Sequence, residues 1–170
     1  MLKKLDANNS SLTSLQDKGL VNIFDKEVQR TFTEDYEEDN SEFSLTKEQT
    51  EIIEKISPNI INKEFNTFLI HGVTGSGKTQ VYIELAKKTL AKKRNVIILV
   101  PEISLTPQIT TRFINTFGNE TAVFHSRMSI GERYDTWRNI IKGKYRIVIG
   151  PRSALFVPLK NIGLIVVDEE

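Results

Sequence analysis

A glycine-rich stretch near the middle of the chain decides the fold. It reads G-V-T-G-S-G-K-T, that is, Gly72, Val73, Thr74, Gly75, Ser76, Gly77, Lys78 and Thr79. The stretch matches the pattern G-x-x-x-x-G-K-[ST], with a short apolar run before it and a helical pattern after it. Glycines let the backbone curl so that several N–H groups point at one phosphate, and the helix N-terminus adds its positive end. We therefore expect a phosphate loop for ATP or GTP, against the competing interpretation of a chance glycine-rich turn.

A second motif closes the sequence as L-I-V-V-D-E-E, residues 164–170. In a phosphate-loop protein, Lys78 reaches the β- and γ-phosphates, and the hydroxyl of Thr79 binds Mg²⁺ together with an acid from another strand. Asp168 is the predicted metal acid, and Glu169 is placed to orient or deprotonate the attacking water. Solvated carboxylates at a strand end are the alternative. Lys78, Asp168 and Glu169 are thus the predicted catalytic residues, and their pattern favours a hydrolase over a small-molecule phosphotransferase.

Apolar runs alternate with helical patterns around these two motifs. Strands are expected at residues 68–70, 96–100, 122–124, 147–149 and 164–167, and helices at residues 78–90, 105–117 and 132–142. Residues 96–100 are continuously apolar, as in a strand covered on both faces of a sheet. The alternation predicts an α/β fold: a parallel sheet with helices on both faces.

Composition narrows the class of protein. The net charge is +1, so nucleic-acid or membrane binding has to come from local patches rather than from the whole chain. With no cysteine, the sequence offers no disulfide and no thiolate zinc site. The N-terminus lacks a signal-peptide pattern and no apolar run is long enough to span a bilayer, so a cytoplasmic protein without membrane contact is expected.

The N-terminal part differs from the rest of the chain. Residues 33–44 are expected to be a solvated linker, because they contain the acidic run Glu34, Asp35, Glu37, Glu38, Asp39 and Glu42 without a basic residue. Before it, residues 10–30 predict a short helix stopped by Gly19, then two short strands. This pattern suits the tail of a winged helix (residues 1–32) or a cap packed on the main domain (residues 45–170) equally well.

Three connecting stretches add a family resemblance. They are V-P-E-I-S-L-T-P-Q (100–108), F-H-S-R-M-S-I-G-E-R (124–133) and I-G-P-R-S-A-L-F-V-P-L (149–159). Together with the phosphate loop and L-I-V-V-D-E-E, they resemble the bacterial replication-restart helicases of the PriA family (primosomal protein N′), in helicase superfamily 2. The resemblance is strong over residues 46–170 and weak over residues 10–30. It implies a RecA-like first helicase lobe preceded by the end of a winged helix.

The resemblance also implies DNA contacts. Residues 101–108, with Glu102 and Thr106, resemble a motif that lines the path of one DNA strand, and Arg152 with Ser153 resembles the next strand-contacting loop. Pro151 departs from the family, which often has a small or hydroxylated residue there. Because proline lacks an N–H donor, a backbone contact to DNA at this position is in doubt.

Other matched positions have competing interpretations. Gln49 stands where helicases of this superfamily carry an adenine-reading glutamine, yet T-K-E-Q (46–49) is also a helix capping box. Trp137, with Tyr134 and Ile141 at helical spacing, is expected in the core rather than as a base-stacking platform. His125, Ser126 and Arg133 belong to a family signature whose role does not follow from their chemistry. A basic helix end is expected to be a solvated face rather than a DNA contact; it comprises Lys87, Lys88, Lys92, Lys93 and Arg94.

For the whole enzyme, the resemblance implies ATP- and Mg²⁺-dependent 3′-to-5′ unwinding of forked DNA, with primosome and single-strand-binding proteins as partners. Relative to that family, we expect the chain to lack later motifs, the second lobe with its arginine finger, and a cysteine-rich zinc insertion. We therefore expect very weak activity from this chain alone. The acid strand is expected either to be a sheet edge or not to be held beside the phosphate loop at all. The alternative is an ATP-binding switch module without unwinding activity.

Overall fold

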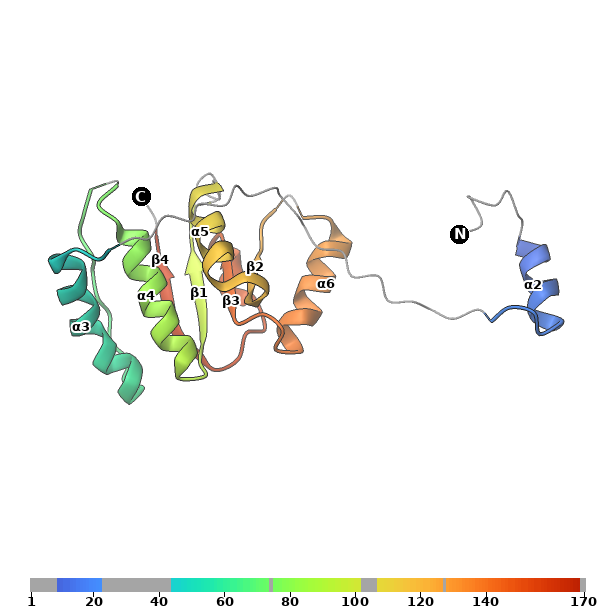
Figure 1. Cartoon of the computed structure of the whole chain (residues 1–170), viewed down its shortest axis with the longest axis horizontal. Coiled ribbons are helices and arrows are strands. Elements are labelled where there is room, and N and C mark those ends of the chain that lie inside the picture. Colours follow the sequence, from blue (N-terminus) through green and yellow to red (C-terminus); the bar gives the residue numbers. More distant parts are fainter. Residues whose placement is uncertain (1–8, 23–43, 74, 102–106, 127, 169–170) are drawn as a thin grey trace.

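The computed structural model describes residues 9–22, 44–73, 75–101, 107–126 and 128–168. Its centre is a four-stranded sheet in the order β2-β3-β1-β4, and every pair of neighbours is parallel. The strands are β1 (Asn95–Leu99), β2 (Thr121–Val123), β3 (Ile147–Gly150) and β4 (Ile162–Val167). The predicted parallel α/β fold is confirmed, with strand positions shifted by one or two residues (Figure 1).

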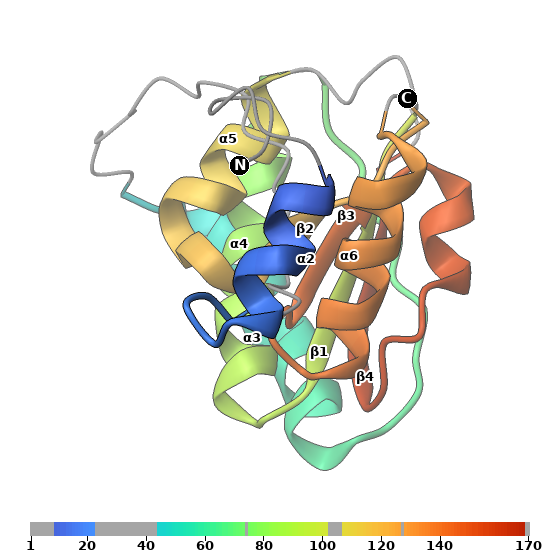
Figure 2. The same cartoon turned by 90° about the vertical axis from the view of Figure 1, so that its right-hand side faces the viewer.

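Helices cover both faces of the sheet. On one face, α4 (Lys78–Ala91) and α5 (Pro107–Phe117) pack on Val96 and Ile98 of β1. On the other face, α6 (Ile130–Ile141) and the 3-10 turn η3 (Arg152–Phe156) pack on Ile97 and Leu99. Figure 2 shows α4 and α5 on one side of the sheet and α6 on the other. This alternation follows from the two-residue period of a strand, which sends successive side chains to opposite faces.

A further helix, α3 (Lys47–Asn62), packs on the outer side of α4. Its buried residues Ile53, Ile56 and Ile60 meet Val81 and Leu85 of α4. The spacing of three and four residues places these isoleucines on one face, so α3 packs on α4 through an apolar stripe.

The strand predicted at residues 68–70 is wrong. The structure gives residues 64–73 no strand, although Phe68 and Ile70 face the cluster between α3 and α4 while Leu69 is 94% exposed. The side chains therefore alternate as in a strand, but the backbone has no strand beside it among the described residues. A strand is defined by ladder hydrogen bonds, and an apolar run cannot supply them without a partner.

Strand β4 is an edge of the described sheet, one of the two alternatives that the family resemblance implied for the acid strand. Among the described strands it pairs with β1 alone. Ile165 and Val167, which point to the same face, are 46% and 60% exposed. The strand that delivers Asp168 is therefore less covered than the fully buried β1.

The N-terminal helix ends as predicted. Helix α2 (Asn9–Asp17) is followed by Gly19 with φ of 68°. The N–H of Gly19 donates to the carbonyl of Gln16 at 2.9 Å, and that of Leu20 donates to the carbonyl of Leu15 at 3.0 Å. This is a glycine C-cap of the Schellman type. The two short strands predicted next lie outside the described residues.

The aromatic face of α6 does not lie in the core, contrary to the sequence interpretation. Tyr134, Trp137 and Ile141 are 60%, 39% and 56% exposed. The opposite face of the helix, with Thr136, Asn139 and Ile140, packs on the sheet instead. Helical spacing identified residues that share a face, but not which face is covered.

Within the described residues, no helix combines the length and apolar character that a membrane span requires.

Gly150 offers a test of strand packing. A Cβ there would overlap the carbonyl oxygen of Phe124 and lie 2.9 Å from the Cβ of Ala154. We expect Gly150→Ala to lower the free energy of unfolding by about 2 kcal/mol, because backbone would have to move. The control Gly143→Ala has φ of 73° but no atom within 4 Å, and should cost about 1 kcal/mol through backbone strain alone. Urea denaturation compares the two, and equal losses would contradict this account of the packing.

Candidate nucleotide-binding site

The glycine-rich stretch forms a loop that leads directly into a helix. Gly75 and Gly77 adopt φ of 81° and 82°, a left-handed conformation that glycine enters without strain. Gly77 is the N-cap of α4, and the N–H of Ser76 donates to the carbonyl of Val73 at 3.1 Å. The strained positions fall on glycines, as the phosphate-loop prediction requires. Thr74 lies outside the described residues.

Lys78 reaches back over this loop. Its Nζ donates to the carbonyl of Gly72 at 2.6 Å and lies 3.5 Å from the carbonyl of Val73. The loop carbonyls therefore hold the ammonium group against the turn that the glycines form. A positive charge beside a curled backbone at a helix N-terminus is an arrangement that binds phosphate.

Gln49 connects α3 to the loop. Its Oε1 accepts from the N–H of Thr46 at 3.0 Å, and its own N–H donates to the Thr46 hydroxyl at 3.3 Å. Its Nε2 donates to the carbonyl of Ser76 at 3.2 Å. The predicted capping box is confirmed, and the same amide also contacts the phosphate loop. Adenine contact by Gln49 stays a prediction.

The start of α3 favours negative charge. The pKa of Glu48, in the first turn, is lowered by a hydrogen bond to its own backbone and, less strongly, by the Thr46 side chain. An ionised carboxylate there also suits the positive end of the helix.

Asp168 lies beside α4. Its N–H donates to the carbonyl of Leu99 at 2.8 Å, which extends the parallel ladder one residue past β4. Its Oδ1 accepts from the hydroxyl of Tyr82 at 3.1 Å. Tyr82 is 6% exposed and was not identified from the sequence. One signal was present: Tyr82 follows Thr79 by three residues, and this spacing places both on one face of a helix.

The remaining predicted residues divide into two groups. Arg152 and Ser153 are exposed at the start of η3, at the carboxyl end of β3, where the carbonyl of Pro151 accepts from the N–H of Ala154 at 2.7 Å. Three others lie outside the described residues: Glu102, Thr106 and Glu169.

The family signature of His125, Ser126 and Arg133 is divided by the structure. His125 is buried and Ser126 is exposed, and the guanidinium of Arg133 lies 5.6 Å from the centre of the Phe124 ring. Arg133 therefore has a packing contact, a cation–π interaction between the first turn of α6 and the residue that follows β2.

Asp168 and Arg152 follow the carboxyl ends of β4 and β3, at the end of the sheet where α4 begins. The carboxyl ends of parallel strands share an edge, and ligands of α/β proteins bind outside that edge. The described residues contain no group of three or more His, Cys, Asp or Glu side chains that could hold a metal. Mg²⁺ on a nucleotide needs fewer protein ligands, one or two oxygen donors beside the phosphates. The Thr79 hydroxyl and the Asp168 carboxylate are donors of that kind, so the residues fit a magnesium nucleotide.

A parallel sheet, a glycine loop opening a helix, a lysine held in that loop and an acid on a neighbouring strand define a P-loop nucleotide-binding domain. The family described as type III restriction enzyme, res subunit (ResIII), matches residues 42–170. The chain belongs to this family. The coarse expectation of nucleotide and Mg²⁺ use agrees with it.

Individual relatives are similar over the whole chain. The chain is 44% identical over 171 residues to the replication restart protein PriA of Bacillus subtilis, covering 100% of the chain and 21% of the relative. It is 45% identical over 170 residues to the replication restart protein PriA of Synechocystis, and the match covers 100% of the chain and 20% of the relative. The chain is also 42% identical over 173 residues to the replication restart protein PriA of Chlamydia muridarum, and the match covers 100% of the chain and 23% of the relative. The predicted resemblance to the PriA proteins is confirmed. The chain spans about a fifth of the length of these relatives.

The contact between Gln49 and the loop can be tested with two glycines. A Cβ on Gly77 would overlap the Gln49 amide nitrogen, whereas one on Gly75 would meet nothing within 4 Å, and both glycines have positive φ. We expect Gly77→Ala to reduce the free energy of unfolding by about 1 kcal/mol more than Gly75→Ala, the worth of one hydrogen bond. Urea denaturation measures this difference. In a Gln49→Ala background the difference should disappear, and its persistence would contradict the contact.

Proposed function

We propose that residues 72–79 bind the phosphates of ATP and that Thr79 and Asp168 hold its Mg²⁺. The observation that carries this proposal is that both halves of the site are attached to one helix. Lys78 begins α4 and bonds to the loop carbonyl of Gly72, and Tyr82, one turn on, bonds to Asp168. Helix α4 thus fixes the distance between the loop and the acid strand.

The proposed chemistry is phosphoanhydride hydrolysis. Loop N–H groups and the Lys78 ammonium orient the γ-phosphate and offset its negative charge. Bound Mg²⁺ would neutralise further charge on the β- and γ-oxygens. Glu169, next to the metal acid in the sequence, would accept a proton from the attacking water, and Gln49 would read the adenine edge.

For the longer protein, we propose an ATP-dependent DNA helicase or translocase acting in replication restart. Support comes from the names of the relatives, replication restart proteins, and from the family match. On this proposal the protein is cytoplasmic, moves 3′ to 5′ on single-stranded and forked DNA, and has primosome and single-strand-binding proteins as partners. Glu102, Thr106, Arg152 and Ser153 would contact one DNA strand.

Nucleotide binding at this site is tested first with a substitution of Lys78. We expect Lys78→Ala to weaken ATP binding to the 170-residue chain at least about 10-fold, because a charge-assisted hydrogen bond to phosphate is lost. Calorimetric titration with a slowly hydrolysed ATP analogue measures the affinity. Lys55→Ala, an exposed lysine on α3, is the control and should bind like the unchanged chain. Equal affinity of all three proteins would refute the proposed site.

Asp168 and Tyr82 are tested through the metal. Asp168→Asn should remove most of the gain in nucleotide affinity that Mg²⁺ gives, while leaving affinity in EDTA unchanged. We expect Tyr82→Phe to have the same effect, about 3-fold to 10-fold in size, because the hydroxyl orients the carboxylate. The control is Tyr134→Phe, an exposed tyrosine on α6. If Tyr82→Phe still reduces the Mg²⁺ gain in the Asp168→Asn background, the two residues do not act together.

Hydrolysis should be slow in this chain alone. The resemblance assigns the arginine finger to a second lobe, and that residue contributes several orders of magnitude to phosphoryl transfer. A steady-state phosphate-release assay with and without single-stranded DNA measures the rate. Strong DNA-stimulated turnover would contradict the expectation. Absence of salt-sensitive single-strand binding would favour the alternative of an ATP-binding switch module.

A further inference from the structure

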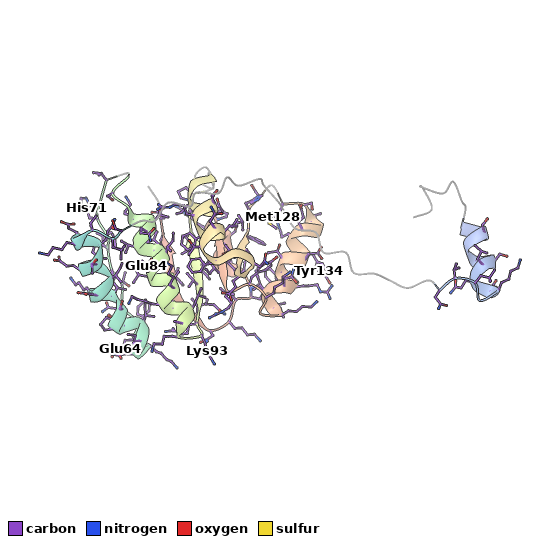
Figure 3. All side chains as sticks on the ribbon, viewed as in Figure 1. Glu64, His71, Glu84, Lys93, Met128 and Tyr134 are labelled. Atoms are coloured by element: carbon purple, nitrogen blue, oxygen red, sulfur yellow. The ribbon has the colours of Figure 1, made fainter. Side chains whose placement is uncertain are left out.

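The end of the domain opposite the phosphate loop carries seven lysines, which we call the basic pole: Lys87, Lys88, Lys92, Lys93, Lys142, Lys144 and Lys160. All seven are exposed. They lie at the end of α4, in the turn after α6 and in the turn before β4, at the amino ends of the parallel strands. Figure 3 shows Lys93 at the end of the molecule opposite His71 and Met128.

Charge is concentrated at this pole although the whole chain carries only +1. Residues 87–95, 142–146 and 160–162 contain no acidic residue. Acidic residues at this end offset part of the charge, and Glu64 lies on the same side of the molecule as Lys93 (Figure 3). Glu84 lies 2.8 Å from Lys87, and Glu120 lies 3.9 Å from Arg146. The lysines outnumber these acids, so positive charge is in excess at this pole on a chain whose net charge is +1.

Helix capping accounts for only some of these lysines: Lys88 lies in the last turn of α4, and Lys142 is the C-cap residue of α6. Basic residues near a helix C-terminus ordinarily stabilise the last carbonyls. Here Arg146 donates to the carbonyl of Leu90 at 2.8 Å, and backbone N–H groups of Lys92 and Arg94 serve the carbonyls of Lys88 and Thr89. Lys160 precedes a strand rather than ending a helix.

The backbone beneath the lysines is held by side-chain hydrogen bonds between turns. Asn161 donates through Nδ2 to the carbonyl of Lys93 at 2.7 Å, and Asn95 donates through Nδ2 to the carbonyl of Lys160 at 2.6 Å. Arg94 donates to the carbonyl of Ile162 at 2.7 Å. Two separate turns thus form one fixed platform, so ordering their backbone adds little cost when a ligand binds.

Lys93 occupies a position that other residues would fill more easily. Its φ is 57°, directly after the C-cap of α4. Glycine or asparagine adopts this left-handed conformation with less strain. A lysine there retains its charge at a conformational cost.

Although the sequence alone favours a solvated face at the end of α4, we propose that the basic pole binds the phosphate backbone of duplex nucleic acid without reading its sequence. Lysine is a compact point charge suited to phosphate, and it lacks the planar fork with which arginine forms paired hydrogen bonds. Single strands are bound by exposed aromatic platforms, but the one aromatic residue of these turns, Tyr145, is half-buried with Lys144 Nζ 5.7 Å from its ring centre. This contact surface is separate from Arg152 and Ser153, which lie at the other end of the sheet.

The test is the salt dependence of binding to a fluorescent DNA duplex, measured by anisotropy on the 170-residue chain. The pole variant combines Lys92→Gln, Lys144→Gln and Lys160→Gln. Its matched control combines Lys18→Gln, Lys47→Gln and Lys55→Gln, three exposed lysines elsewhere. We expect the pole variant to bind at least about 10-fold more weakly at low salt, with the slope of log K against log salt reduced by about 2 to 3, near 0.9 for each lost phosphate contact.

Several outcomes would overturn the proposal: an unchanged slope in the pole variant, an equal loss in the control, or a loss of binding to phosphatidylserine vesicles with duplex binding intact. Lys93→Asn keeps the left-handed turn, so it should fold at least as stably and bind duplex more weakly. ATP-analogue affinity should be unchanged in the pole variant and reduced in Lys78→Ala, which separates this proposal from that of the nucleotide site.

Discussion

Strand β1 is the constraint on which the rest of the domain depends. It pairs with β3 on one side and with β4 on the other. Val96, Ile97 and Ile98 are completely buried, and each such side chain contributes about 1.5 to 3 kcal/mol of burial free energy. Because its alternate residues support α4 and α5 on one face and α6 on the other, any shift of its register would move both layers.

Helix α4 converts this packing into a site. Its N-terminus begins at the phosphate loop, its middle packs on β1, and its hydroxyl-bearing residue Tyr82 contacts the acid strand. Its last turn leads into the lysines at the opposite end of the sheet. One helix therefore spans the distance between a proposed nucleotide site and a proposed duplex contact.

Patterns that depend on neighbouring residues could be predicted from the sequence. The phosphate loop, the capping box at Thr46, the glycine C-cap at Gly19 and the parallel α/β fold are of this kind. The segment 68–70 had the alternation of a strand but not the ladder, since pairing depends on a partner that local sequence does not specify. Helical spacing correctly places Tyr134 and Trp137 on one face of α6. Whether that face is buried depends on tertiary packing, which the local sequence does not specify. The contact of Tyr82 with Asp168 joins residues 86 positions apart. Helical spacing places Tyr82 on the face of Thr79, but it does not identify Asp168 as the partner.

The edge position of β4 has a consequence for the order in which the domain opens. Parts of a protein with fewer buried contacts open at lower free energy than the core. Strand β4 has one described neighbour, and Val167 is 60% exposed just before Asp168. The amide protons of β4 should therefore exchange with solvent through local fraying. Those of β1 should exchange only when the whole domain unfolds. The carboxylate proposed to hold the metal therefore lies in the part of the site that opens most readily. A ligand that bridges this carboxylate to α4 would stabilise the edge strand against local opening.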